Sequence, residues 1–195
     1  MHTRTIELLT YLDDQRARLR GAFEEVPAAS RQRAPAPDRW SAVEVIEHVA
    51  MVERLIAQRL AEAIASARAD RVGPEQATEP VLPTFTAHLT RLLDRTTMIE
   101  APPAVRPTGL TAEAAWRALE EAGASVREAL TAGDGLALGT RTMPQRILGE
   151  MPLYYFFAFI GAHEARHAAQ LREIAAVFSS AEPFSAGSPD RAAPS

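Results

Sequence analysis

The chain has 195 residues, 47% of them hydrophobic and 24% charged, and a formal net charge of -4. This length and balance are typical of one globular domain with a sizeable core and exclude wholesale disorder. All 21 basic residues are arginines and acidic residues outnumber them, so no positive excess favours a nucleic acid as partner. There is no cysteine, which excludes disulfides, thiolate metal ligands and a cysteine nucleophile.

Neither a signal segment nor a membrane span is expected. The first residues run into mixed-charge sequence instead of an apolar core, which predicts a cytoplasmic protein. The longest strongly apolar stretch, residues 153–162, is much shorter than the roughly 20 residues that cross a bilayer. We therefore expect no membrane partner and assign this stretch to a buried helix.

Helical periodicity dominates, and strand-like alternation is hard to find, so the predicted fold class is all-α. A first helix is expected over about residues 3 to 26, with Arg16 as the one polar residue on its apolar stripe. Ser41 and Glu44 have the spacing of a capping box and predict the start of a second helix that runs to about Ala69. The expected seam of this second helix consists of Val45, His48, Val52 and Leu55.

The second half of the chain adds two long helices and a shorter one. Residues 85–99 read as a short amphipathic segment lying across the bundle, Thr111 as the N-cap of the third long helix, and Pro152 as the start of the fourth. We therefore predict a four-helix bundle with an additional short helix between the second and third long helices, forming one domain over residues 1–178. Residues 179–195 lack periodicity and are predicted to be a disordered tail.

Three histidines on the expected seams are candidate metal ligands. His163 and His167 lie four residues apart on one helix, so their rings point the same way and can bind one ion. Two partnerless imidazoles in one apolar seam would be costly, because each loses its hydrogen bonds to water. His48, on the seam of the second helix, supplies a third ligand. Three protein ligands with an open position are typical of a catalytic metal.

The neighbours of these histidines leave several roles open. Glu164 lies about 100° around the helix from His163, and is either a base or partner at the edge of the metal site or an exposed carboxylate. Gln170, one turn beyond His167, either hydrogen-bonds a ligand or substrate or satisfies the backbone. Both are candidate catalytic residues. Glu44 is assigned to the helix cap.

The segment 163–167 also matches H-E-x-x-H, the zincin metallopeptidase signature in which the glutamate is the general base. The extended form of that motif places Gly and His where this chain has Gln170 and Glu173. Little sequence follows His167 to supply another ligand, and no substrate-aligning strand is evident upstream. A peptidase is therefore the less favoured interpretation.

Residues 39–48 read W-S-x-x-E-x-x-x-H at a helix start, and residues 148–171 contain an H-x-x-x-H-x-x-Q-[IL] helix. These two segments resemble those of the DinB-like superfamily of metal-dependent enzymes. The resemblance implies a four-helix bundle whose metal ligands are His48, His163 and His167. It further implies one divalent ion, zinc or nickel first and iron or manganese as alternatives, and a homodimer.

The leading functional hypothesis is a metal-dependent enzyme in which the ion activates a thiol cosubstrate or water. The reaction would be transfer to, or hydrolysis or isomerisation of, a small electrophile, as in low-molecular-weight-thiol S-transferases and metal-dependent hydrolases. Arg16 is the candidate for binding the carboxylates of such a thiol. The alternative is a non-catalytic metal-binding or stress-related module.

Overall fold

Four long helices form a bundle in the computed structural model, which describes residues 1–94, 96, 100–146 and 148–180. The described elements are α1 (Thr3–Glu24), α2 (Ala42–Ala69), α3 (Thr86–Leu93), α4 (Ala112–Ala132), β1 (Thr142–Gln145), β2 (Gly149–Pro152) and α5 (Leu153–Ser180). This architecture confirms the predicted all-α bundle with a short helix between the second and third long ones.

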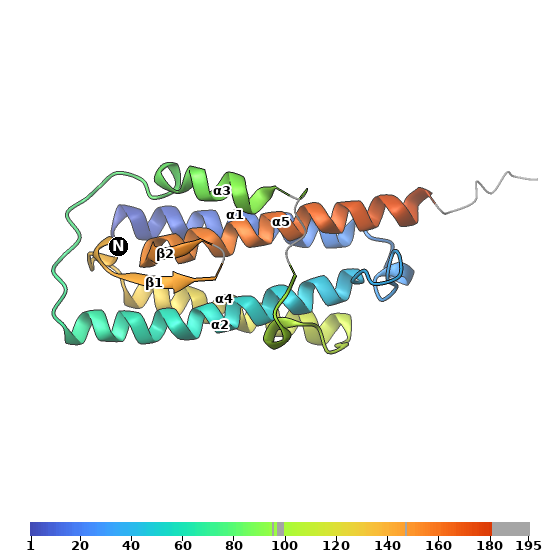
Figure 1. The fold of residues 1–195 in the computed structure, drawn as a ribbon, viewed down its shortest axis with the longest axis horizontal. Coiled ribbons are helices and arrows are strands. Elements are labelled where there is room, and N and C mark those ends of the chain that lie inside the picture. The colour runs from blue at the N-terminus through green and yellow to red at the C-terminus, as the bar shows by residue number, and fades with distance from the viewer. Residues whose placement is uncertain (95, 97–99, 147, 181–195) are drawn as a thin grey trace, which may run out of the picture.

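The long helices form two pairs that run in opposite directions. α1 and α5 lie side by side and run one way, and α2 and α4 run the other way (Figure 1). α2 also packs on α5, and α1 meets α4 only sparsely. None of the described helices, α5 included, has the length and apolar character that a membrane crossing requires.

The buried apolar side chains divide into two clusters along the bundle. One cluster contains Leu12, Ile56, Val126 and Ile160, and the other contains Leu19, Val49, Leu119 and Ala168. Each long helix places one residue between these two clusters that is charged or is a glycine. These four residues are Arg16, Glu53, Gly123 and Glu164. The bundle therefore has a polar layer in its middle.

The predicted helix starts are confirmed at the level of individual hydrogen bonds. The Ser41 amide donates to Glu44 Oε2 at 2.7 Å and the Glu44 amide donates to Ser41 Oγ at 3.2 Å, so both halves of the capping box are present. Thr111 Oγ1 accepts from the Ala114 amide at 3.2 Å and caps α4. Glu44 is thus occupied at the start of α2, as predicted.

Several sequence predictions differ from the structure. The hairpin of β1 and β2 was not predicted, because its strands are four residues long and contain Pro144 and Pro152, which weaken any strand signal. α3 lies along α5 instead of across the bundle and ends at Leu93. Ile99, the predicted end of that segment, lies outside the described residues.

Two further sequence predictions differ from the structure. Leu55 was predicted on the seam of α2 but is 49% exposed, since the buried face continues from Val49 through Ile56 and Leu60 and so lies one position further along the chain than predicted. α5 extends to Ser180 and so includes the first two residues of the predicted tail. The rest of that tail, residues 181–195, lies outside the described residues.

α1 and α5 approach each other closely at Gly161, where α5 has no side chain. A Cβ built on Gly161 would lie 2.3 Å from Cε1 of Tyr11. Such a separation is far inside van der Waals contact, so only glycine allows the Tyr11 ring to lie this close to α5. Gly161 precedes His163 by two residues, so this contact fixes α1 beside the metal-ligand segment of α5.

We expect Gly161→Ala to lower the free energy of unfolding by about 1–3 kcal/mol, because the added methyl must displace the Tyr11 ring. Gly21→Ala is the matched control: Gly21 is also helical, but its Cβ would meet nothing within 4 Å, so this change should stabilise by up to about 1 kcal/mol. Urea unfolding curves measure both. Equal effects of the two substitutions would contradict the close approach.

Candidate metal centre

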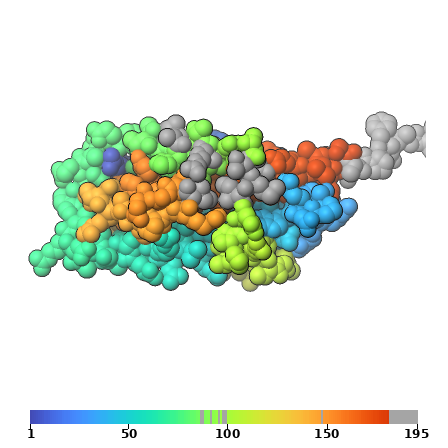
Figure 2. Space-filling model, viewed as in Figure 1, coloured from blue at the N-terminus to red at the C-terminus, as the bar shows by residue number. Residues whose placement is uncertain are grey.

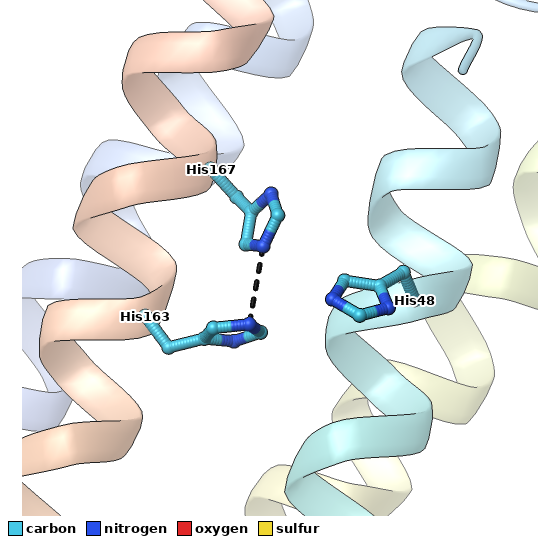
Figure 3. Close-up of side chains that lie close together, drawn as sticks. All are labelled: His48, His163 and His167. Carbon is cyan, nitrogen blue, oxygen red and sulfur yellow. Dashed lines mark hydrogen bonds between the residues drawn. The ribbon is translucent and has the colours of Figure 1, made fainter. Parts of the chain in front are cut away.

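The three predicted histidines meet between α2 and α5. His48 projects from α2, and His163 and His167 project from successive turns of α5, so that the three rings converge on one space (Figure 3). One ring nitrogen from each residue lies within 4.8 Å of the other two. In the part of the chain that the structure describes, this is the group of side chains arranged to hold a metal ion.

The spacing of the nitrogens fits a first-row metal ion. Two imidazole nitrogens bound tetrahedrally at about 2.1 Å from one zinc ion lie about 3.4 Å apart. The Nε2 atoms of His163 and His167 are 3.1 Å apart, close to that value. The separations to His48 are at most 4.8 Å, so small rotations of the rings bring all three nitrogens to bonding distance.

His48 is held in one orientation by the backbone. Its Nδ1 lies 2.7 Å from the carbonyl oxygen of Val105. Because a carbonyl only accepts, Nδ1 carries the proton and Nε2 keeps its lone pair for an ion. The Trp40 ring packs against the His48 ring with centroids 4.8 Å apart. His48 is therefore fixed in both tautomer and position.

The loop that supplies the Val105 carbonyl is anchored by Glu47, the residue beside His48. The Glu47 carboxylate accepts bonds from the amide and hydroxyl of Thr108 and from the amides of Gly109 and Leu110, at 2.6–3.1 Å. Burial opposes ionisation, but these four bonds outweigh it and lower the pKa of Glu47. Figure 2 shows the segment after residue 100 lying on the surface beside α2. This interaction was not predicted from the sequence.

The two histidines of α5 differ in their surroundings. Nδ1 of His167 lies 2.9 Å from Oε1 of Gln170, so the amide oxygen accepts from this ring and leaves Nε2 for an ion. The His163 ring stacks on Phe159, with centroids 5.8 Å apart, and its buried Nδ1 has no hydrogen-bond partner. Gln170 thus lies against a metal-ligand candidate, and its catalytic role stays a prediction.

Burial favours the neutral form of His48 and His163. It lowers the pKa of His48, and it lowers the pKa of His163 well below the usual range, with further lowering from the charges of His167 and His48. Only a neutral imidazole offers a lone pair to a metal. At neutral pH these two histidines therefore offer a lone pair to an ion without first losing a proton.

Glu164, the other candidate catalytic residue, does not join the histidines. Its side chain is only 1% exposed, which rules out the alternative of a solvated surface carboxylate. Its Oε1 accepts from Nε of Arg16 at 2.9 Å, and its Oε2 is buried with no hydrogen-bond partner. The carboxylate thus points into the polar layer of the bundle toward α1.

Arg16 is the centre of that layer. Its Nη2 donates to Oε2 of Glu53 at 2.6 Å, and its Nη1 donates to the carbonyl oxygen of Leu119 at 3.1 Å. Gly123 makes room for it, since a Cβ there would lie 3.0 Å from Nη1. These bonds occupy the guanidinium, which speaks against the predicted role of Arg16 in binding a thiol's carboxylates.

Glu53 was missed by the sequence reading. A single glutamate in a long helix looks like part of an exposed face, and nothing local in α2 indicates that its partner lies on α1. The one available signal was Arg16, which interrupts the apolar stripe of α1. A buried arginine needs an acidic partner, so its presence predicts a buried acid on another helix.

The geometry also bears on the peptidase interpretation of residues 163–167. In that motif the glutamate must face the metal-bound water as a general base. Here Glu164 is bonded to Arg16, and the third ligand of the trio is His48, more than 100 residues upstream on another helix. This placement argues against a zincin-type site.

Fold and site together define a helical-bundle protein whose facing helices present three histidines suited to one metal ion. The family model of the DinB superfamily matches residues 11–171, which include all three histidines. The chain belongs to the DinB superfamily. No curated protein and no solved structure matches it.

We expect Glu47→Gln to weaken metal binding about 10- to 100-fold, because a side-chain amide cannot accept all four bonds that hold the Val105 loop against His48. Glu44→Gln is the control, since glutamine preserves a capping box. Competition titration of Zn²⁺ against a chromogenic chelator measures both affinities. Unchanged affinity of the Glu47 variant would show that the loop does not orient His48.

We expect Arg16→Met to lower the free energy of unfolding by about 3–5 kcal/mol, because it leaves two buried carboxylates without their counter-charge. Arg117→Met removes an exposed pair with Glu113 and should cost less than about 0.5 kcal/mol. Urea unfolding at pH 7 compares them. If Arg16→Met lowered the free energy of unfolding as little as the control does, the structural role of the polar layer would be contradicted.

Proposed function

We propose that this chain is a metal-dependent enzyme that binds one divalent ion through His48, His163 and His167. The convergence of these three imidazoles from two helices is the observation that carries the proposal. Zinc and nickel are the first candidates, with iron and manganese as alternatives, because three imidazoles discriminate poorly among these ions. Three histidines leave coordination positions open for a reacting molecule.

Each part of the site has a defined task in this proposal. When bound, the ion supplies Lewis acidity that favours a thiolate or hydroxide nucleophile at neutral pH. Gln170 and the Val105 carbonyl hold His167 and His48 in the required tautomers. Trp40 and Phe159 provide apolar walls that limit water beside the imidazoles. Glu164, bonded to Arg16, is a structural residue in this proposal.

We infer that the substrate is a small electrophile, acted on by transfer of a low-molecular-weight thiol, by hydrolysis or by isomerisation. The absence of cysteine from the chain means that any thiol must come from a cosubstrate. A homodimer and a cytoplasmic location belong to the same proposal, and the homodimer rests on the family resemblance.

A non-catalytic metal-binding module is the second candidate. His48 and His167 are buried, and none of the three histidines lines the cavity between α2 and α4 or the cavity between α1 and α4. A site that is closed to substrate would bind metal and turn nothing over.

The metal claim is tested by stoichiometry. Purified protein loaded with Zn²⁺ and dialysed should retain about one ion per chain, and His48→Ala should retain far less, because two ligands remain. His88→Ala is the control, since His88 packs on Phe85 and Tyr155 outside the trio. If elemental analysis showed that the His48 variant retains its full zinc content, the three-histidine site would be wrong.

The catalytic claim is tested by turnover. Monochlorobimane is a small electrophile that becomes fluorescent on thiol transfer, so metal-loaded protein is incubated with it and with a panel of low-molecular-weight thiols. We expect at least one thiol to react well above the metal-free and His48→Ala controls. If every thiol reacts only at the control rate while the ion is bound stoichiometrically, thiol transfer is excluded and the binding module is favoured.

A further inference from the structure

A direct contact between two acids joins the helices that carry the metal-ligand candidates. α2 carries His48 and Glu53, and α5 carries His163 and Glu164. The carboxyl group of Glu53 is hydrogen-bonded to that of Glu164. Both side chains are only 1% exposed. This contact, which we call the carboxyl link, therefore ties α2 to α5 inside the bundle, beside the histidines and independently of them.

The carboxyl link requires a proton between the two acids. Ionised carboxylates only accept hydrogen bonds, so two of them cannot bond to each other. Arg16 donates to one oxygen of each acid, and the other oxygens, Oε1 of Glu53 and Oε2 of Glu164, are buried. If both acids were ionised, each of these two oxygens would lack a partner. A proton on Oε1 of Glu53 lets it donate to Oε2 of Glu164, so both buried oxygens are satisfied.

Glu53 is the acid that keeps this proton. Burial and the negative charge of Glu164 raise the pKa of Glu53 well above its usual range, against the lowering effect of Arg16. Arg16 approaches Oε1 of Glu164 with two nitrogens, Nε at 2.9 Å and Nη2 at 2.8 Å, but reaches Glu53 with Nη2 alone, at 2.6 Å. The polar layer thus contains one guanidinium and one carboxylate, whose charges balance, and the neutral Glu53 links them.

The carboxyl link lies close to the histidines on both helices. Glu164 directly follows His163, and Glu53 lies five residues, or about 7.5 Å of helix, beyond His48. Across the site itself the His48 ring only packs against the rings of His163 and His167, with centroids 5.3 and 5.0 Å apart. Metal ligands must be held to within about 0.5 Å of the binding geometry. A directional bond between the same two helices can supply that precision.

We propose that Glu53 is a positioning residue of the metal centre: its hydrogen bond to Glu164 sets the separation of α2 and α5 at which all three histidines reach one ion. This inference rests on the proposed metal site. Glu53 acts through the helices and touches neither the ion nor a substrate. Its task also differs from that of Arg16, which bonds to all three other long helices.

The test breaks the carboxyl link and leaves the charges balanced. Glu53→Met has a similar volume, cannot donate to Glu164, and keeps the ion pair of Arg16 with Glu164. We expect it to weaken Co²⁺ binding about tenfold, measured by titration of the full chain, and to change the visible d–d spectrum of the bound ion. Glu53→Gln should bind Co²⁺ as the wild type does, because its amide oxygen accepts from Arg16 and its amide nitrogen donates to Glu164.

Two controls separate positioning from stability. Leu130→Ala opens a cavity on α4 and lowers stability without touching the carboxyl link, so it should leave the Co²⁺ affinity and spectrum unchanged. Nuclear Overhauser effects between the ring protons of His48 and His163 report the same geometry in metal-free protein. We expect these effects to weaken in Glu53→Met and to persist in Glu53→Gln. If Glu53→Met fails to fold, Glu53→Asp, which is one methylene shorter, takes its place.

The outcomes distinguish this proposal from the metal proposal on which it rests. The positioning role is overturned if Glu53→Met matches the wild type in Co²⁺ affinity, spectrum and ring contacts. It is also overturned if Glu53→Gln is as impaired as Glu53→Met, and in both cases the three-histidine site stands. If the wild type itself binds no Co²⁺, the proposed metal site is contradicted, and the metal-free ring contacts alone then decide whether Glu53 positions His48.

Discussion

The guanidinium of Arg16 is the one group in the described bundle that bonds to all three other long helices at the same level. Projecting from α1, it donates to Glu53 of α2, to the Leu119 carbonyl of α4 and to Glu164 of α5. Such a group fixes register, because sliding any helix by one turn would leave buried charges unpaired, at a cost of several kcal/mol. Arg16 therefore fixes the helices at the height along the bundle where the metal-ligand candidates lie, since His163 directly precedes Glu164.

This arrangement explains why α2 and α5 carry polar residues on two sides in the middle of an apolar bundle. One side of the pair presents the three imidazoles, held by backbone and side-chain acceptors, and the other presents the carboxylates that bind Arg16. The apolar clusters at either end supply the stabilising burial. The polar layer adds little net stability of its own, but it makes one helix arrangement much better than its alternatives.

The sequence predicted an interaction correctly where both of its residues lie within one helix. The His163–His167 pair and the Ser41–Glu44 cap follow from spacing alone, and both lie as predicted. His48 was predicted from its seam position and partly from the family resemblance, because its meeting with α5 is a tertiary contact. Glu47 and Glu53 were missed for the same reason: their partners, the loop at Thr108 and Arg16, lie far away in sequence, so each acid resembled an exposed one. The short hairpin gave no periodic signal.

The central claim is that His48, His163 and His167 bind one ion together. Anomalous diffraction from crystals of the Zn²⁺-loaded protein tests it most directly. The account predicts one strong peak between α2 and α5, with a nitrogen of each of the three imidazoles at about 2.0–2.1 Å. A peak whose ligands exclude His48, or an ion bound to Glu164 in its place, would contradict it.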